Sequence, residues 1–268
     1  MIIVDAHTHL GNDIYAGQWS TESGDAAADE YARVMRAAGV NKGFMFTMAG
    51  LVSDPQPGND ELARGRDRYP DLMLPWGTVD PYWTEAKIRA EMRRCIRELG
   101  FYGFKLHPWL QGFSLTVPGM EVVAEECAEL GVPVIFHDGT AFYATPLQVA
   151  YFARAHPKVT VLSGHGGLAE LWADTIQPAK ELPNYYIVLN GPVQSGMQKI
   201  YDEVGADKLM FGSDGGSFHP STVTWYLRRA RALRAPAADL EKILGLTALR
   251  LVGLAPSPEG SQTAAAIS

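Results

Sequence analysis

Short apolar runs alternate with amphipathic segments along almost the whole chain. The runs are continuously apolar, which is typical of strands buried on both faces of a parallel sheet. Eight such runs predict strands, at residues 2–4, 40–47, 72–79, 103–106, 132–136, 159–162, 185–189 and 209–211.

The segments between these runs show the apolar spacing of helices. Gly39, Gly100 and Gly131 stand where helices commonly end, and Thr84 stands where one begins. Residues 48–58 contain two prolines and two glycines and predict a loop, with Asn59 capping the helix that follows. The predicted helices span 26–38, 59–69, 84–99, 118–130, 145–155, 168–180, 193–204 and 221–233.

Eight strand–helix units in an unbroken chain predict an α/β fold, a single (β/α)8 TIM barrel over residues 1–254. Two short helices, 237–244 and 247–252, follow the eighth unit. Residues 255–268 are rich in Ala, Ser and Pro and predict a poorly ordered tail. A doubly wound open sheet is the alternative. The first strand–helix turn lacks Gly-x-Gly-x-x-Gly, which counts against a dinucleotide fold.

Residues with reactive side chains gather at the carboxyl ends of the predicted strands. His7 and His9 follow the first strand and, two residues apart, point the same way. A barrel brings all its strand ends to one mouth, so residues far apart in sequence meet there. The residues at these ends are His7, His9, Lys105, His107, His137, Asp138, His165 and Asp214.

Five motifs in this order resemble the amidohydrolase superfamily, specifically the amidohydrolase-2 branch that includes aminocarboxymuconate semialdehyde decarboxylase. They are His-Thr-His at 7–9, Gly-Phe-Lys-Leu-His-Pro at 103–108, Val-Ile-Phe-His at 134–137, Ser-Gly-His-Gly-Gly at 163–167 and Phe-Gly-Ser-Asp at 211–214. The resemblance implies that His7, His9, His137 and Asp214 ligate one divalent metal, most often zinc. It assigns His165 to the metal's outer surroundings or to proton transfer.

The chemistry of these residue types agrees with that assignment. Three imidazoles and one carboxylate, with room for a water, make an open catalytic zinc site. A metal brings the pKa of a bound water toward neutrality. Asp214 can accept the water's proton and return it to a leaving group. A protonated His165 can polarise a carbonyl or neutralise a carboxylate.

Three further residues have open roles. Lys105 either binds a substrate carboxylate or, as in some superfamily members, becomes carboxylated and bridges a second metal. His107 lies on the same side of its strand, as a substrate contact or as a support for the following loop. His219, in the loop after the eighth strand, is a predicted substrate contact.

These observations predict a metal-dependent hydrolase that uses a metal-activated water on an ester, lactone or amide carbonyl. The alternative is a metal-dependent nonoxidative decarboxylase of an unsaturated or aromatic carboxylic acid. The chain is short for such a decarboxylase, which favours hydrolysis. A non-catalytic ligand-binding barrel is the third interpretation. It is disfavoured because unused buried His and Asp side chains reduce stability.

Charge, apolar run lengths and cysteine spacing limit the classes of binding partner that we expect. The net charge of −7 offers no field for a polyanion, so nucleic acid is not an expected partner. No apolar run approaches the length of a bilayer span, and no signal peptide is visible. Cys95 and Cys127 have none of the spacings of a disulfide framework. We expect a cytoplasmic protein with a small-molecule substrate and no membrane partner. A homodimer is expected from the family alone.

Overall fold

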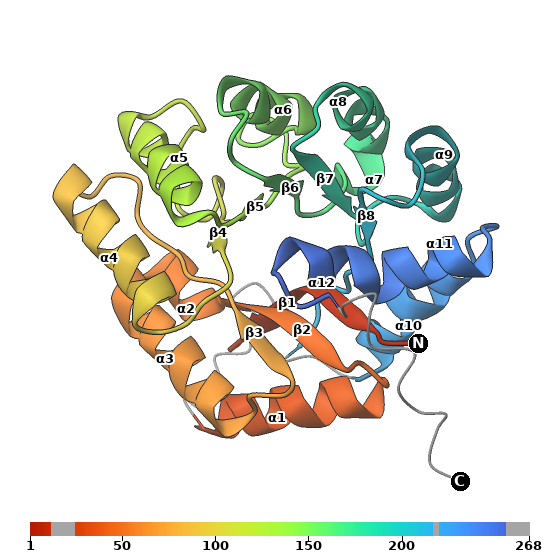
Figure 1. Cartoon of the computed structure of the whole chain (residues 1–268), viewed down its shortest axis with the longest axis horizontal. Coiled ribbons are helices and arrows are strands. Elements are labelled where there is room, and N and C mark those ends of the chain that lie inside the picture. The colour runs from red at the N-terminus through yellow and green to blue at the C-terminus, as the bar shows by residue number, and fades with distance from the viewer. Residues whose placement is uncertain (12–24, 217–219, 256–268) are drawn as a thin grey trace, which may run out of the picture.

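Eight parallel strands form the centre of the part of the chain that this computed structural model describes, residues 1–11, 25–216 and 220–255. They lie in two sheets, ordered β1-β2-β3 and β4-β5-β6-β7-β8, and helices surround them (Figure 1). The strands are β1 Val4–Leu10, β2 Lys42–Thr47, β3 Met73–Pro75, β4 Phe104–Leu106, β5 Val134–Phe136, β6 Val161–Ser163, β7 Tyr185–Val188 and β8 Leu209–Met210.

Backbone hydrogen bonds join the two sheets at both seams. Between β3 and β4, the N–H of Gly77 donates to the carbonyl of Gly103 at 2.9 Å, and that of Lys105 donates to Gly77 at 2.8 Å. Between β8 and β1, the N–H of His9 donates to the carbonyl of Gly215 at 2.7 Å. The strands therefore follow one another in chain order around a TIM barrel, as predicted, and their carboxyl ends meet at one mouth.

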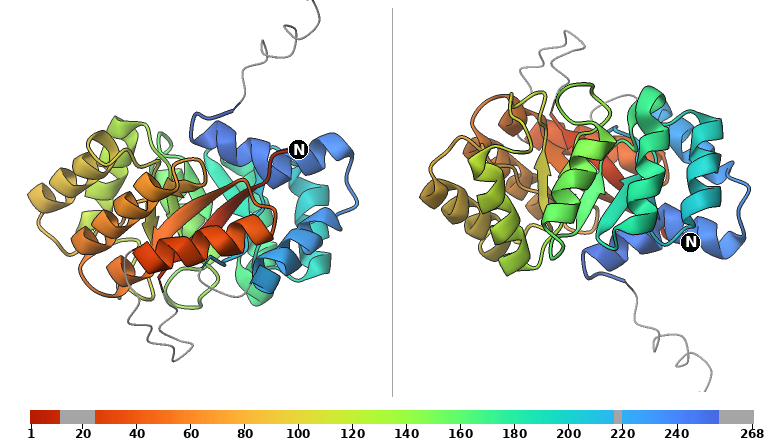
Figure 2. Two further views of the ribbon diagram at one scale, coloured as in Figure 1. Left: turned by 90° about the horizontal axis from the view of Figure 1, so that it is seen from below. Right: turned by 90° about the horizontal axis from the view of Figure 1, so that it is seen from above.

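The helices form the outer layer of the barrel, as the two views of Figure 2 show. No helix among the described residues is long and apolar enough to cross a membrane. The helices are α1 Asp25–Ala37, α2 Met48–Val52, α3 Pro55–Arg68, α4 Glu85–Arg97, α5 Pro118–Leu130, α6 Pro146–Ala155, α7 Leu168–Leu171, α8 Ile176–Glu181, α9 Gln194–Val204, α10 Pro220–Arg231, α11 Ala237–Glu241 and α12 Thr247–Leu251.

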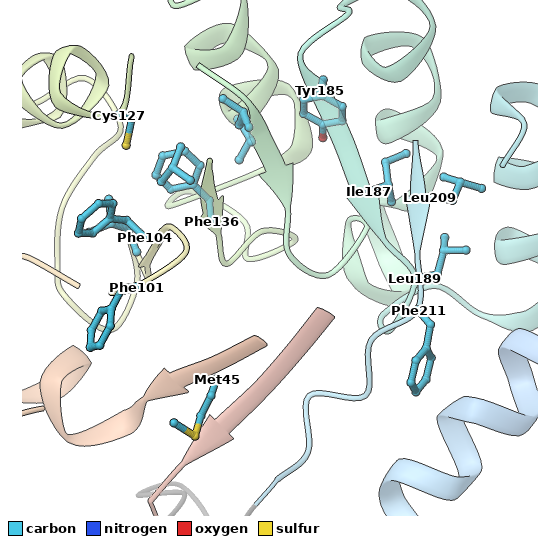
Figure 3. Packing of buried hydrophobic residues seen from close by; sticks show 14 of the residues in the cluster. Met45, Phe101, Phe104, Cys127, Phe136, Tyr185, Ile187, Leu189, Leu209 and Phe211 are labelled. Atoms are coloured by element: carbon cyan, nitrogen blue, oxygen red, sulfur yellow. The ribbon is translucent and has the colours of Figure 1, made fainter. Parts of the chain in front are cut away.

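Two apolar clusters account for the alternation of side chains along the strands. The inner cluster, which includes Phe46, Trp76 and Ile135, fills the barrel and extends to Leu249 of α12. The outer cluster lies between strands and helices; Figure 3 shows Phe104, Phe136 and Tyr185 within it. Each large side chain buried in this way stabilises the fold by about 1.5–3 kcal/mol. The buried Cys95 and Cys127 lie in α4 and α5 as free thiols.

The predicted loop at residues 48–58 is wrong. The hydroxyl of Thr47 accepts a hydrogen bond from the N–H of Gly50 at 3.0 Å and begins α2, and Asp54 caps α3 with Pro55 in its first turn. A Cβ on Gly58 would lie 2.7 Å from the Cα of Gly50, so these glycines permit α2 and α3 to touch rather than breaking a helix.

Two smaller sequence predictions also differ from the structure. Asn59 does not cap a helix; it is buried in α3, where its amide donates to the carbonyl of Thr78 at 3.0 Å. The helix expected over 168–180 is broken into α7, a 3-10 turn over Trp172–Thr175, and α8. The predicted tail lies almost wholly outside the described residues, since these end at residue 255.

Candidate functional site

A bulge in β1 aims His7 and His9 at the mouth of the barrel. The pairing of β1 with β2 shifts by one residue between Asp5 and Thr8, so the alternation of inward and outward side chains is reset there. Beyond the bulge, the hydroxyl of Thr8 points outward to the Tyr31 hydroxyl at 2.8 Å. The rings of His7 and His9 lie on the inner side with their centroids 5.2 Å apart.

Asp214 follows β8 and meets these histidines from the other end of the chain. Its Oδ1 lies 3.1 Å from Nε2 of His9 and 3.4 Å from Nε2 of His7. Its N–H donates to the carbonyl of His7 at 2.9 Å. The buried carboxylate of Asp5 accepts hydrogen bonds from the N–H groups of His7 at 3.2 Å and Ser213 at 2.9 Å. Asp5 thus fastens together the two segments that carry these side chains.

Asp138 and Asn190 orient His165, which follows β6. The buried Asp138 carboxylate accepts hydrogen bonds from the N–H of His165 at 2.7 Å, the N–H of Gly167 at 2.8 Å and the hydroxyl of Ser163 at 2.7 Å. Nδ1 of His165 lies 3.2 Å from Oδ1 of Asn190. Because an amide oxygen only accepts, this contact places the imidazole proton on Nδ1 and leaves Nε2 as an acceptor.

His7, His165 and Asp214 each offer a ligand atom, and the three atoms lie within 4.8 Å of one another. Imidazole nitrogens and a carboxylate are donors that zinc and similar divalent cations accept. Nδ1 of His7 lies 2.7 Å from the carbonyl of Gly164, which fixes the Nδ1–H tautomer and leaves Nε2 as an acceptor facing the cluster. Metal-ligating histidines need this kind of support, so the residues present fit a divalent ion.

His137 and His107 form the adjoining side of the mouth. Their rings are stacked with centroids 3.8 Å apart, and the ring of His137 lies 4.4 Å from that of His165. Nε2 of His137 contacts the hydroxyl of Thr140 at 2.7 Å. Nδ1 of His107 accepts the N–H of Leu110 at 3.2 Å, which supports the loop after β4. Metal ligation by His137 stays a prediction.

Lys105 lies inside the barrel between the apolar core and the histidines. Its Nζ is 3.1 Å from Nε2 of His7 and 5.2 Å from the ring centroid of Phe46, and only 1% of the residue is exposed. Among the described residues no carboxylate forms an ion pair with it. Burial lowers the pKa of Lys105 to about 7, although the charges of Asp214 and Asp138 oppose this shift.

Burial is the main cause that lowers the pKa values of the imidazoles in the mouth. The pKa of His165 falls to about 4, and those of His7, His107 and His137 fall well below the ordinary value. Burial is the largest influence on Asp214 and raises its pKa, but the charge of His165, the hydrogen bond with His9 and the charges of His9 and Lys105 together outweigh it, so the net shift of the pKa is downward. Neutral imidazoles beside an ionised carboxylate are the protonation states that metal binding requires.

A cavity of about 250 Å³ adjoins this cluster. Two of the residues in its wall, Leu168 and Asp214, have left-handed backbone angles, with φ of 54° and 57°. Non-glycine residues in this region are strained, and such strain is concentrated at functional sites. The cavity is lined by His165, Leu168, Ala169, Glu170, Asn190, Gly191, Asp214 and Tyr226.

The sequence analysis missed three residues of this site. Asn190 lies two residues after the end of β7, so the rule that selected the other strand ends also applies to it. Asp5 lies within β1 and Tyr226 within α10, and neither carries a sequence signal of its role. The predicted contact residue His219 lies outside the described residues.

The chain is similar to known proteins along nearly its full length. A family model described as Amidohydrolase (Amidohydro_2) matches residues 4–254. A 2-amino-3-carboxymuconate-6-semialdehyde decarboxylase of Dictyostelium discoideum is 34% identical over 79 residues, which are 30% of this chain and 22% of that protein. That match therefore spans less than a quarter of the relative's length.

Two solved structures show the same fold. A 2,6-dihydroxybenzoate decarboxylase from Rhizobium superposes with a TM-score of 0.68 at 18% identity, covering 94% of this chain and 99% of the other. A 5-carboxyvanillate decarboxylase from Novosphingobium aromaticivorans, with bound manganese, has a TM-score of 0.71 at 16% identity, covering 94% and 97%.

Proposed function

Because this chain belongs to the Amidohydrolase (Amidohydro_2) family, we propose that it is a metal-dependent enzyme that decarboxylates a small unsaturated or aromatic carboxylic acid without oxidation. The partial match to a carboxymuconate semialdehyde decarboxylase supports this reaction. The sequence alone favoured hydrolysis of an ester, lactone or amide, which uses the same histidines and aspartate.

The observation that carries the proposal is the buried Lys105. An ammonium group out of water needs an anionic partner, and none of the carboxylates in the described residues forms an ion pair with it. A substrate carboxylate would supply that partner. A neutral ester, lactone or amide would leave the charge unpaired. A carboxylic acid substrate therefore accounts for a lysine in this position more directly than a neutral ester, lactone or amide does, and the decarboxylase relative supplies the reaction.

One divalent ion would be held by His7, His9 and Asp214, with His137 as the fourth ligand. His165 also offers a ligand atom close to those of His7 and Asp214, and this proposal assigns it to proton transfer instead. When bound, the ion supplies a Lewis acid that attracts the oxygens of the substrate. The manganese of the 5-carboxyvanillate decarboxylase supports a divalent metal without deciding between zinc and manganese.

The side chains at the mouth of the barrel would bind the substrate, transfer the proton and exclude water. Lys105 binds the carboxylate and orients it toward the cluster. Asp214 and His165 both line the cavity, and one of them would take up a proton from the substrate or from solvent and pass it to the carbon that bears the carboxylate. The carbon–carbon bond then breaks, its electron pair restores the unsaturated system, and CO2 leaves. Leu168 and the inner apolar cluster help to exclude water during this step.

Release of CO2 is the direct test. The metal-loaded protein should release CO2 from members of a panel of hydroxybenzoates and unsaturated dicarboxylates, and a chelator should abolish the release. A matched panel of lactones, esters and amides serves as the comparison. Hydrolysis of the neutral compounds without CO2 release from the acids would overturn the proposal and restore the hydrolase interpretation.

Metal content and activity should separate His137 from His165. We expect His137→Ala to lose most of its metal, because His137 would be a ligand. We expect His165→Ala to keep its metal but to lose about 100-fold in kcat, because His165 lines the cavity and would transfer a proton. Elemental analysis and steady-state kinetics measure both quantities. Metal retained in His137→Ala and lost in His165→Ala would reverse the two roles.

A further inference from the structure

Tyr226 stands where the small cavity beside Asp214 meets a wider hollow on the surface of α10. It lines the cavity of about 250 Å³ together with His165 and Asp214. It also lines the outer hollow, of about 740 Å³, together with Trp225 and Arg228. A molecule that reaches the reactive cluster through this hollow therefore passes the ring of Tyr226.

Neighbouring side chains hold the ring of Tyr226 in place. The ring of Trp225 meets it nearly edge-on, with centroids 4.8 Å apart and an interplanar angle of 81°. The Arg229 guanidinium lies 5.6 Å from its centroid and is itself anchored by a hydrogen bond to the carbonyl of Pro192. A ring fixed on two sides presents its hydroxyl at a defined position, which is what recognition requires.

The hydroxyl of Tyr226 is available for a ligand. Within residues 1–11, 25–216 and 220–255, no residue forms a hydrogen bond with it. Burial, and next the charge of Asp214, raise the pKa of Tyr226, so the phenol keeps its proton and acts as a donor. Asn190 and Glu170 are the other polar side chains of the cavity that lie outside the reactive cluster.

We propose that Tyr226 determines substrate specificity by donating a hydrogen bond to a polar substituent that the substrate acid carries away from its carboxylate. The inference rests on the proposed function, which places a carboxylic acid in this cavity with its carboxylate toward Lys105. A cavity of about 250 Å³ is smaller than the 300–1,000 Å³ typical of sites for drug-sized ligands. The inner cavity therefore has room for an acid of about one ring bearing a hydroxyl, carbonyl or second carboxylate.

Binding of simple acids tests this role independently of turnover. Calorimetric titration of the metal-loaded protein with benzoate and with 2-, 3- and 4-hydroxybenzoate gives four dissociation constants. We expect at least one hydroxybenzoate to bind about tenfold more tightly than benzoate, the value of one neutral hydrogen bond. In Tyr226→Phe this preference should disappear, while the affinity for benzoate stays the same.

Tyr151→Phe is the matched control, because it makes the same chemical change at an exposed tyrosine of α6, away from the cavity. It should leave all four constants unchanged. A preference that persists in Tyr226→Phe, or equal binding of all four acids by the wild type, would overturn the inference. A preference that depends on Tyr226 without CO2 release from any acid would sustain the inference and contradict the proposed reaction.

Discussion

Replacing Asp214 by Asn is expected to lower kcat about 10³- to 10⁴-fold, the upper range for loss of a positioned acid or base. The proposed function gives this side chain two roles. Its Oδ1 lies within 3.4 Å of the Nε2 atoms of both His7 and His9, so it would supply the negative charge of the candidate metal centre. It also faces the cavity, where it can hold a proton for the substrate.

Asn is the informative substitution because it removes the charge and keeps the backbone. Asp214 has a φ of 57°, a left-handed conformation that Asn and Asp adopt more readily than other non-glycine residues. The hydrogen bond from its N–H to the carbonyl of His7 is unaffected by the change. Alanine would instead strain this turn and mix a folding defect with a catalytic one.

Steady-state kinetics and metal analysis should be read together for this variant. A large loss of kcat with part of the metal retained indicates that Asp214 acts in proton transfer as well as in ligation. The exposed Asp202 on α9 offers the matched control, and Asp202→Asn should behave as the wild type. An Asp214→Asn enzyme with kcat within tenfold of the wild type would contradict the role assigned to this carboxylate.

The barrel could be predicted from sequence because its signals are local. Continuously apolar strands, and helices closed by glycine as at Gly131, report their own conformation whatever surrounds them. The prediction at residues 48–58 was wrong because glycines that look like loop residues are there for a contact between two helices. Gly50 and Gly58 serve the contact between two helices, and no single-chain pattern distinguishes that use from a loop.

The candidate site was predictable as far as strand ends mark it. His7, His165 and Asp214 were selected by their positions after strands, and the structure brings all three together. The bulge that turns His7 and His9 inward is a register shift between two strands, so it could not be predicted from β1 alone. Tyr226 reaches the cavity from the middle of a helix, where tyrosine is most often a packing residue.

Replacing Lys105 by Met should lower kcat/KM for a carboxylic acid about 100- to 1,000-fold, as expected when a preorganised charged donor is removed from a site that excludes water. The reason is that Met fills the same volume beside Phe46 and cannot attract the carboxylate. Since burial lowers the pKa of Lys105 to about 7, the ammonium form predominates only below that pH. Affinity for the acid should therefore weaken in the wild type as the pH rises through about 7, and should lose this dependence in Lys105→Met.

The stability of this variant distinguishes a functional lysine from a structural one. Between pH 7 and 10.5, the ordinary pKa of a lysine, the unfolded chain holds more protons than the folded one, so the lysine's contribution to stability rises with pH across that window. Below pH 7 the lysine is charged in both states, and burying this charge lowers the free energy of unfolding by its full desolvation cost. Lys105→Met removes that cost, and its Tm at pH 6 should equal or exceed that of the wild type.

Lys208 provides the control: it donates to the carbonyls of Ala179 at 2.7 Å and Leu182 at 2.6 Å at the opposite end of the barrel. Lys208→Met should lower Tm without changing KM. A Lys105→Met protein that unfolds at a lower temperature and retains its kcat/KM would show that Lys105 serves the fold. That result would remove the main support for a carboxylate substrate.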